Sequence, residues 1–275
     1  MSQTSMTLEK EIITRTEVAA YTLKNVSFGY SPSQQVISDV SFSVREGERV
    51  ALLGANGSGK SSLLKILNGL IFPTSGSIQC FGEELTETGL KMDKTNFQFR
   101  RRVGFVFQNS DAQLFNTTVR EEIIYGPLQL HLSAGDIEQR LNDIVGMLGI
   151  THLLDRSPFR LSGGEKKKVA IASVLITNPN VVLLDEPTNG LDPRSQMWMT
   201  DILNTLNTAG KTIIIATHDL DMVRRIADRV IVMGEDHKVA AIGQTDQILQ
   251  NRELLIAVNL IHEHSHWHGE VYHSH

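Results

Sequence analysis

Residues 54–61, with the sequence GANGSGKS, restrict the fold of this chain more than any other segment. They fit the pattern G-x-x-x-x-G-K-[ST], in which glycines let backbone N–H groups surround phosphate oxygens, the lysine adds positive charge and the final hydroxyl can ligate Mg²⁺. Residues 49–53 predict a short buried strand before this segment. A helix after it is predicted from apolar residues at helical spacing, namely Leu63, Ile66, Leu67 and Leu70. Because a helix N-terminus attracts anions, we predict a phosphate-binding turn between strand and helix.

The composition is typical of a globular protein. The chain has 275 residues, of which 41% are hydrophobic and 21% charged, and its formal net charge is −5. This size supports a substantial core, and the charge gives no general attraction to nucleic acid. Apolar runs such as residues 181–184 are far shorter than a membrane span, so any membrane role is expected to need a partner. The single cysteine, Cys80, and a lead without an apolar signal segment favour the cytoplasm.

Strand and helix patterns alternate along most of the chain, which predicts an α/β fold with a parallel sheet. Residues 1–20 are expected to form a flexible lead, and the main domain to span residues 21–250. Within it, alternation at residues 21–44 predicts an antiparallel hairpin, and residues 109–165 a helical subdomain. Residues 251–275 form a separate C-terminal segment. Further strands are predicted at 77–81, 101–107, 181–184, 212–216 and 229–233, and helices at 162–176 and 194–208.

Two acids follow the hydrophobic strand at residues 181–184, and a second glycine pair opens a predicted helix. Asp185 and Glu186 come at the carboxyl end of that strand, where ligands bind in parallel sheets. Asp185 is the candidate Mg²⁺ ligand, and Glu186 the candidate general base for an attacking water. The glycine pair belongs to the segment Leu-Ser-Gly-Gly-Glu at 161–165, in which Ser162 is a good helix N-cap.

The order of these motifs resembles that of the ATP-binding cassette ATPases over about residues 21–245. The resemblance implies a RecA-like P-loop core with a parallel sheet, an N-terminal antiparallel β subdomain and an inserted helical subdomain. It also implies ATP hydrolysis in a head-to-tail dimer. ATP would contact Tyr30, Gly54, Asn56, Gly57, Ser58, Gly59, Lys60, Ser61 and Ser62 of one subunit, and Ser162, Gly163, Gly164 and Glu165 of the other.

The resemblance assigns further roles to individual residues. The catalytic residues would be Glu186, His218, Lys60 and Gln108. Tyr30 would stack on adenine, and His218 would contact the γ-phosphate. Mg²⁺ would be held by Ser61, Gln108 and Asp185, while Asp192 would lie at the dimer seam. Glu165 departs from the glutamine that many members carry at this position, and we expect activity to survive it.

Two stretches, residues 105–128 and 161–172, are similar to the ATPases of energy-coupling-factor importers. This similarity implies a membrane coupling subunit, a substrate-binding membrane subunit, and a homodimer or a closely similar ATPase partner at the cytoplasmic face of the cell membrane. The surface around Gln113, Leu114 and Phe115 would then receive coupling helices. A nucleic-acid site needs a basic face, usually with interleaved aromatics. The basic run at 166–168 lies on a predicted helix just after a loop expected to contact ATP, and the run at 100–102 precedes a strand, so both are expected to be solvated faces near nucleotide or subunit seams.

The C-terminus is rich in histidine. Four histidines occupy alternate positions, so in extended backbone they would share one face and bind Ni²⁺ or Co²⁺; they are His262, His264, His266 and His268. A histidine-rich end resembles the cobalt and nickel members of the importer group, so the sequence predicts import of one of these metals. The alternatives are an ATPase of a vitamin importer with an incidental tail, a non-transport cassette ATPase acting on nucleic acid or ribosomes, and a metal-storage or sensing protein in which the cassette is degenerate. The absence of a tandem cassette disfavours the second alternative, and the intact Glu186 and His218 disfavour the third.

Overall fold

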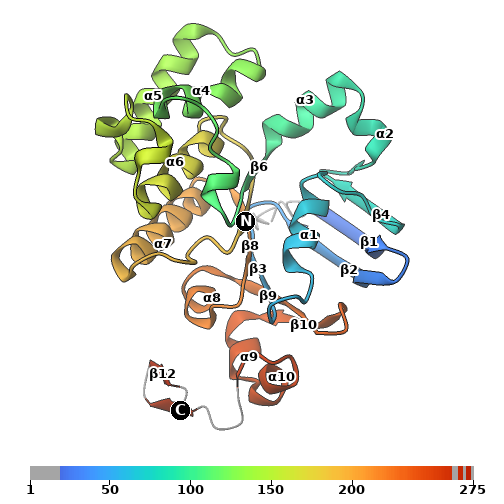
Figure 1. Cartoon of the computed structure of the whole chain (residues 1–275). Coiled ribbons are helices and arrows are strands. Elements are labelled where there is room, and N and C mark those ends of the chain that lie inside the picture. Colours follow the sequence, from blue (N-terminus) through green and yellow to red (C-terminus); the bar gives the residue numbers. More distant parts are fainter. Residues whose placement is uncertain (1–18, 262–265, 269–270, 274–275) are drawn as a thin grey trace, which may run out of the picture.

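The computed structural model describes residues 19–261, 266–268 and 271–273. Two large sheets, a layer of helices and a two-stranded sheet near the C-terminus build the part of the molecule that is described (Figure 1). The predicted lead at residues 1–20 lies outside the described residues except for its last two positions, which begin the first strand. The α/β fold that the sequence predicts, with its antiparallel subdomain and helical insert, is confirmed.

The N-terminal sheet is antiparallel, with the strand order β2-β1-β4-β5. Its strands are β1 (Ala19–Ser31), β2 (Gln34–Arg45), β4 (Ser75–Cys80) and β5 (Glu83–Glu84). The predicted hairpin is therefore confirmed, and its turn lies at Pro32 and Ser33. Residues alternate between buried and exposed along β2, as expected for a sheet with one face on the core.

The second sheet has the order β10-β9-β3-β8-β7-β6 and is parallel except at its β10 edge. Its strands are β3 (Arg49–Leu53), β6 (Val103–Val106), β7 (Val181–Asp185), β8 (Thr212–Thr217), β9 (Arg229–Met233) and β10 (Val239–Gln244). Every residue of β7 and β8 is buried, because both faces of the sheet are covered. The sequence pattern did not reveal β10, whose residues are only half-buried in alternation.

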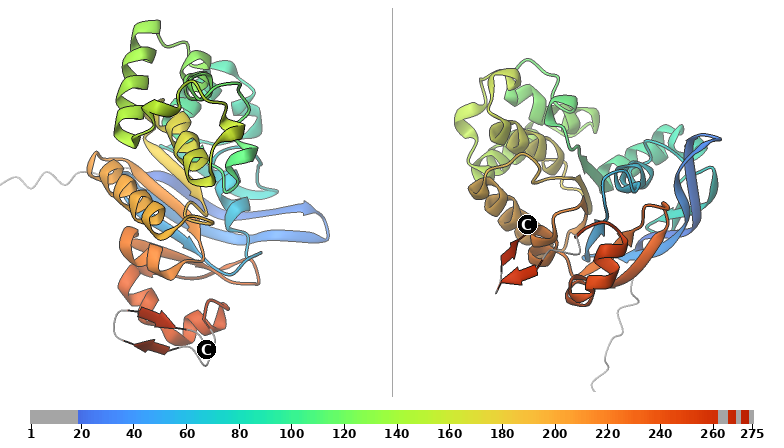
Figure 2. Two further views of the ribbon diagram at one scale, coloured as in Figure 1. Left: turned by 60° about the vertical axis from the view of Figure 1, so that its left-hand side comes forward. Right: turned by 60° about the horizontal axis from the view of Figure 1, so that its bottom comes forward.

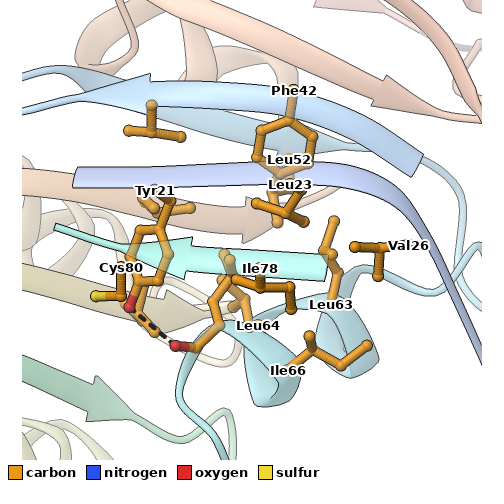
Figure 3. Packing of buried hydrophobic residues seen from close by; sticks show 14 of the residues in the cluster. Tyr21, Leu23, Val26, Phe42, Leu52, Leu63, Leu64, Ile66, Ile78 and Cys80 are labelled. Atoms are coloured by element: carbon orange, nitrogen blue, oxygen red, sulfur yellow. Dashed lines mark hydrogen bonds between the residues drawn. The ribbon is translucent and has the colours of Figure 1, made fainter. Parts of the chain in front are cut away.

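Helix α1 (Lys60–Leu67) lies between the two sheets. Its apolar side meets Leu23 and Ile78 of the antiparallel sheet and Leu52 of the parallel sheet (Figure 3). Each of these leucines and isoleucines contributes roughly 1.5–3 kcal/mol by leaving water. The Tyr21 hydroxyl donates to the Leu67 carbonyl oxygen at 2.9 Å, which satisfies an acceptor at the end of the helix. Leu70 was expected on the same helical stripe, but it follows the helix and is exposed.

Helices cover the other face of the parallel sheet (Figure 2). They include α4 (Val119–Gln129), α5 (Ala134–Leu148), α6 (Gly163–Leu175), α7 (Pro193–Thr208) and short 3₁₀ turns at Ser110–Ala112, Thr151–Leu153 and Pro158–Arg160. Gly149 ends α5 in the left-handed region with φ 67°, where glycine carries no Cβ penalty. Ser162 caps α6 as predicted.

The remaining helices lie around the two sheets. They are α2 (Glu87–Leu90), α3 (Asp93–Arg102), α8 (Leu220–Ile226), α9 (Thr245–Gln250) and α10 (Arg252–Ala257). Residues 101 and 102 end α3 rather than beginning the predicted strand. Near the C-terminus, β11 (His266–His268) pairs with β12 (Val271–His273). Within the ranges that the structure describes, no helix combines the length and apolar character needed to span a membrane.

Candidate nucleotide-binding site

The predicted phosphate loop connects the carboxyl end of β3 to the start of α1. Gly59 stands just before the helix with φ 106°, a conformation that side-chain-bearing residues rarely adopt. A Cβ atom at Gly59 would also lie 2.2 Å from the Val36 carbonyl oxygen. The glycine is therefore required by the close approach of β2 to the loop.

Two polar side chains of this loop, those of Lys60 and Ser58, are buried. The Lys60 ammonium is buried and donates to the carbonyl oxygens of Gly54 at 2.8 Å and Ala55 at 3.0 Å. Burial lowers the pKa of Lys60 below its ordinary value, while the charges of Glu186 and Asp185 oppose that shift. The Ser58 hydroxyl is buried and has no hydrogen-bond partner among the described residues.

The two acids at the carboxyl end of β7, Asp185 and Glu186, lie beside this loop. Ser61 donates a hydrogen bond to Asp185 at 2.9 Å, although the two residues are 124 positions apart. Burial raises the pKa of Asp185, the Ser61 hydrogen bond lowers it, and the charge of Glu186 raises it further. Glu186 has φ 43°, which is unusual for a residue with a side chain, and such strain clusters at functional sites. Its backbone N–H is held by the Ala216 carbonyl oxygen at 2.9 Å.

The Glu186 carboxylate is positioned by residues at the end of the neighbouring strand β8. Thr217 donates its hydroxyl to Glu186 Oε2 at 3.1 Å, and His218 Nδ1 lies 2.9 Å from Oε1. Glu186 is buried, whereas the His218 side chain is about half exposed. The histidine therefore contacts the acid on one side and solvent on the other, where a ligand can reach it.

These residues line one cavity of about 410 Å³. Its walls are formed by Val36, Asn56, Gly57, Gly59, Lys60, Ser61, Ser62, Gln108, Glu186, Asn189 and His218. The structure thus brings together nine of the predicted site residues, with Asp185 held against Ser61. Sequence reasoning missed Val36 and Asn189. Asn189 follows Glu186 in the same turn and could have been found from that position, whereas the hairpin pattern gives no signal for Val36.

Tyr30 lies at the end of β1, next to this cavity. Its hydroxyl is 3.2 Å from the Ser62 hydroxyl, and its ring packs edge-on against Phe28 with 5.0 Å between centroids. The side chain is 54% exposed. The hydroxyl is therefore anchored at the phosphate loop while the ring remains free to stack on a base.

Magnesium is not part of the structure, but the donor set fits it. Mg²⁺ prefers oxygen ligands and usually takes a few protein groups together with phosphates. The predicted ligands Ser61 and Asp185 are already in contact, and Gln108 lines the same cavity. Elsewhere in the ranges that the structure describes, no group of three or more His, Cys, Asp or Glu side chains is arranged to hold a metal ion.

The Ser162–Glu165 segment and Asp192 do not line this cavity. Ser162 and Glu165 form a reciprocal cap, in which Ser162 donates its backbone N–H and its hydroxyl to Glu165 Oε2 at 2.8 Å each. The Ser162 N–H, followed by its hydroxyl, lowers the pKa of Glu165. Asp192 caps α7 and accepts from Arg194 and Ser195. Ser162, Gly163 and Asp192 are exposed, whereas Gly164 and Glu165 are partly exposed.

Two expectations about surface residues hold only in part. Leu114 was expected on a docking surface but is buried in the helical layer, and Gln113 bonds to α6, so only Phe115 of that group is exposed. The basic runs were expected to be solvated. Lys167 is instead 4% exposed, and Arg100 donates to the Asn68 carbonyl oxygen at 2.8 Å. Long side chains of this type bury their stems while keeping polar contacts for the head group.

The predicted tail metal site falls largely outside the described residues. His262 and His264 are not among the described residues. For His266 and His268 the structure gives the backbone of β11, and the register pairs His266 with His273 of β12.

Comparison with known proteins places this site in a family. Residues 37–189 match the model of the ABC transporter family. A protein of Methanosarcina acetivorans, provisionally described as an ABC transporter ATP-binding protein, is 51% identical to this chain. The alignment covers 91% of this chain and 92% of that protein. The nickel import ATP-binding protein NikO of Rhodobacter capsulatus is 46% identical, and the alignment covers 88% of this chain and 96% of NikO.

A solved structure shares the fold as well as the sequence. It is cbiO1 from Clostridium perfringens, described as part of the ABC transporter complex cbiONQ, with a TM-score of 0.76, 35% identity and coverage of 89% of this chain and 96% of its own. The phosphate loop, the paired acids at the carboxyl end of β7 and these similarities lead to one conclusion. The chain belongs to the ABC transporter family as an ATP-binding subunit, an ATPase coupled to transport.

Proposed function

We propose that this protein is the ATP-hydrolysing subunit of an importer that takes up a transition metal, nickel or cobalt, through membrane partners. The observation that supports hydrolysis most directly is the convergence of Lys60, Ser61, Glu186 and His218 on one cavity. The nickel assignment is supported by the similarity to NikO over nearly its full length. Cobalt is retained because the histidine-rich end resembles members of the group that handle either metal.

In the proposed reaction, the residues act mainly by position and charge, as phosphoryl transfer requires. Lys60 and the loop N–H groups neutralise phosphate oxygens. Mg²⁺, when bound by Ser61, Asp185 and Gln108, supplies further charge neutralisation on the β- and γ-phosphates. Glu186 orients water and accepts its proton, and Thr217 holds the carboxylate in place.

The second half of each ATP site is proposed to come from another ATPase subunit. Ser162, Gly163, Gly164 and Glu165 begin α6 away from the cavity of their own chain, which supports a role in trans. The partner is a second copy of this chain or a closely similar ATPase, with Asp192 at the seam between the two.

An exposed apolar patch is proposed to receive the membrane coupling subunit. It consists of Phe115, Tyr125 and Leu128, which are 60%, 42% and 50% exposed. The two aromatic rings meet edge-on with 5.0 Å between centroids. Glu122 Oε2 accepts from the backbone N–H groups of Phe115 and Asn116 at 2.8 Å each, which fixes the loop that presents Phe115. Such a patch marks an interaction site, and we place it at the cytoplasmic face of the cell membrane.

The C-terminal histidines are proposed to bind Ni²⁺ or Co²⁺ in a regulatory or buffering role, since imidazole suits both ions. The register of β11 and β12 supports this, because His266 stands opposite His273 while His268 is two residues along the same strand. Deleting residues 262–275 is expected to leave ATP hydrolysis unchanged and to lower the number of Ni²⁺ ions bound in a calorimetric titration. Equal metal binding by the shortened chain would remove this role.

The transport proposal is tested by uptake of radiolabelled Ni²⁺ and Co²⁺ in cells that carry this protein with its native membrane partners. Uptake of one ion by wild type, and its loss in Glu186→Gln, would establish the substrate and its energy source. Absence of uptake for both ions, with ATP hydrolysis intact, would contradict metal import and favour the vitamin alternative. Co-purification with membrane subunits separates both from a non-transport ATPase.

A further inference from the structure

Lys167 is a buried lysine in the second turn of α6, and its ammonium group contacts the loop that carries Gln108. Its Nζ donates to the carbonyl oxygens of Gln108 at 2.8 Å and Phe107 at 3.3 Å. Only 4% of the residue is exposed. Burying an ammonium group is costly, so its two backbone acceptors fix the geometry of the loop closely.

The same loop is attached to α6 by further contacts on the other side. Phe107 donates its backbone N–H to Gln113 Oε1 at 3.1 Å, and Gln113 Nε2 donates to the Ala170 carbonyl oxygen at 2.7 Å. Lys166 pairs with Asp111 at 2.6 Å on the more exposed side. The segment from 107 to 113 is therefore attached to α6 at several points rather than free to move by itself.

These contacts connect two functional segments of one chain. Gln108 lines the cavity that holds Lys60 and Glu186. The other end of the connection is the start of α6, where Ser162 lies five residues before Lys167, a rise of about 7.5 Å along the helix. Through this connection, a displacement of the Ser162 segment would move the backbone of Gln108.

We propose that Lys167 is a positioning residue for ATP hydrolysis, which sets the place of Gln108 and links it to the start of α6. The inference rests on the proposed role of Gln108 at the Mg²⁺ and water site, and it is independent of which substrate is transported. A lysine that only fills space in the core would support folding without affecting Gln108. The two roles differ in how the effects of substitution combine.

The test is a double-mutant cycle in the full-length chain with Lys167→Met, Gln108→Ala and the double variant. For each we would measure kcat, the Mg²⁺ concentration for half-maximal rate, the Kd of labelled ATP and the Tm. Lys168→Met is the matched control, because the neighbouring Lys168 lies over the Trp198 ring, 4.9 Å from its centroid. Hydrogen bonds from a charged donor contribute about 1.5–3 kcal/mol, so we expect kcat to fall about 10- to 150-fold in Lys167→Met.

We also expect Lys167→Met to need more Mg²⁺ and to bind ATP with a Kd within about twofold of wild type. In the Gln108→Ala background, Lys167→Met should cause no further loss, because residues acting through one group are not additive. Additive losses, or a wild-type kcat in Lys167→Met, would overturn the proposal. If Gln108→Ala itself keeps full activity, the assignment of Gln108 fails and this inference fails with it.

Should Lys167→Met melt well below wild type, Lys167→Gln provides the same cycle with a neutral donor in place of the ammonium group. Partial recovery of kcat in Lys167→Gln, lost again in the Gln108→Ala background, supports positioning. A kcat in Lys167→Gln that tracks only its Tm contradicts it.

Discussion

Replacing Glu186 with glutamine removes the proposed base while keeping its shape. In the structure the carboxylate accepts from Thr217 at 3.1 Å and meets His218 at 2.9 Å, and an amide oxygen can still accept from Thr217. We therefore expect the free energy of unfolding to change by no more than about 1 kcal/mol. General base catalysis contributes about 10²- to 10⁴-fold, so kcat should fall by that factor, which corresponds to roughly 3–5 kcal/mol in the barrier.

ATP binding should survive the same change. The charge of Glu186 raises the pKa of Asp185, so its removal makes Asp185 easier to ionise and leaves less negative charge near the phosphates. We expect an equal or lower Kd for Mg²⁺-ATP, together with a longer-lived ATP-bound dimer.

The assay is single-turnover phosphate release, with ATP binding measured in parallel. Glu87→Gln is the matched control, because its side chain is 61% exposed in α2 and its ion pair with Lys91 is a surface pair of little energetic weight. A Glu186→Gln chain that releases phosphate within threefold of the wild-type rate would show that another group orients the water.

Three further substitutions test the site. Lys60→Ala should weaken ATP binding about 10- to 150-fold in a titration with labelled ATP, because a charged donor is lost; unchanged affinity would contradict its contact with phosphate. Tyr30→Ala should weaken ATP binding about 5- to 150-fold but leave tripolyphosphate binding unchanged, since stacking acts on the base alone. Equal effects on both ligands would argue against stacking. Asp185→Asn should raise the Tm of the nucleotide-free chain at pH 7 while weakening Mg²⁺-ATP binding. Burial is the largest effect on Asp185 and raises its pKa in the folded chain, so folding favours the protonated carboxyl. The contribution of Asp185 to stability is therefore fully present below its pKa in the unfolded chain and is lost as pH rises through its pKa in the folded chain. The Tm advantage of Asp185→Asn should thus shrink in acid, and Asp155→Asn, an exposed site, should show neither effect.

The sequence predicted most of the parallel sheet because its strands are short apolar runs with clear boundaries. Residues 49–53 and 229–233 were placed without error. Errors came where the environment, rather than local pattern, decides the outcome. Leu70 fits the helical spacing but follows the turn that ends α1, and Lys167 belongs to a charged run but points inward. A lysine ammonium can be buried where two carbonyl oxygens accept its hydrogen bonds, and the local sequence pattern does not show that those acceptors are present.

The chemistry of the phosphate loop was determined by the sequence alone, because its glycines, Lys60 and Ser61 are neighbours in the chain and act through one local turn. Which acids meet that loop was decided only by the tertiary structure. Asp185 touches Ser61, and Glu186 meets His218, because the parallel strands β3, β7 and β8 end at the same edge of the sheet. Contacts between residues on different strands, 124 positions apart for Ser61 and Asp185 and 32 for Glu186 and His218, depend on strand order, which hydrophobic patterns leave open.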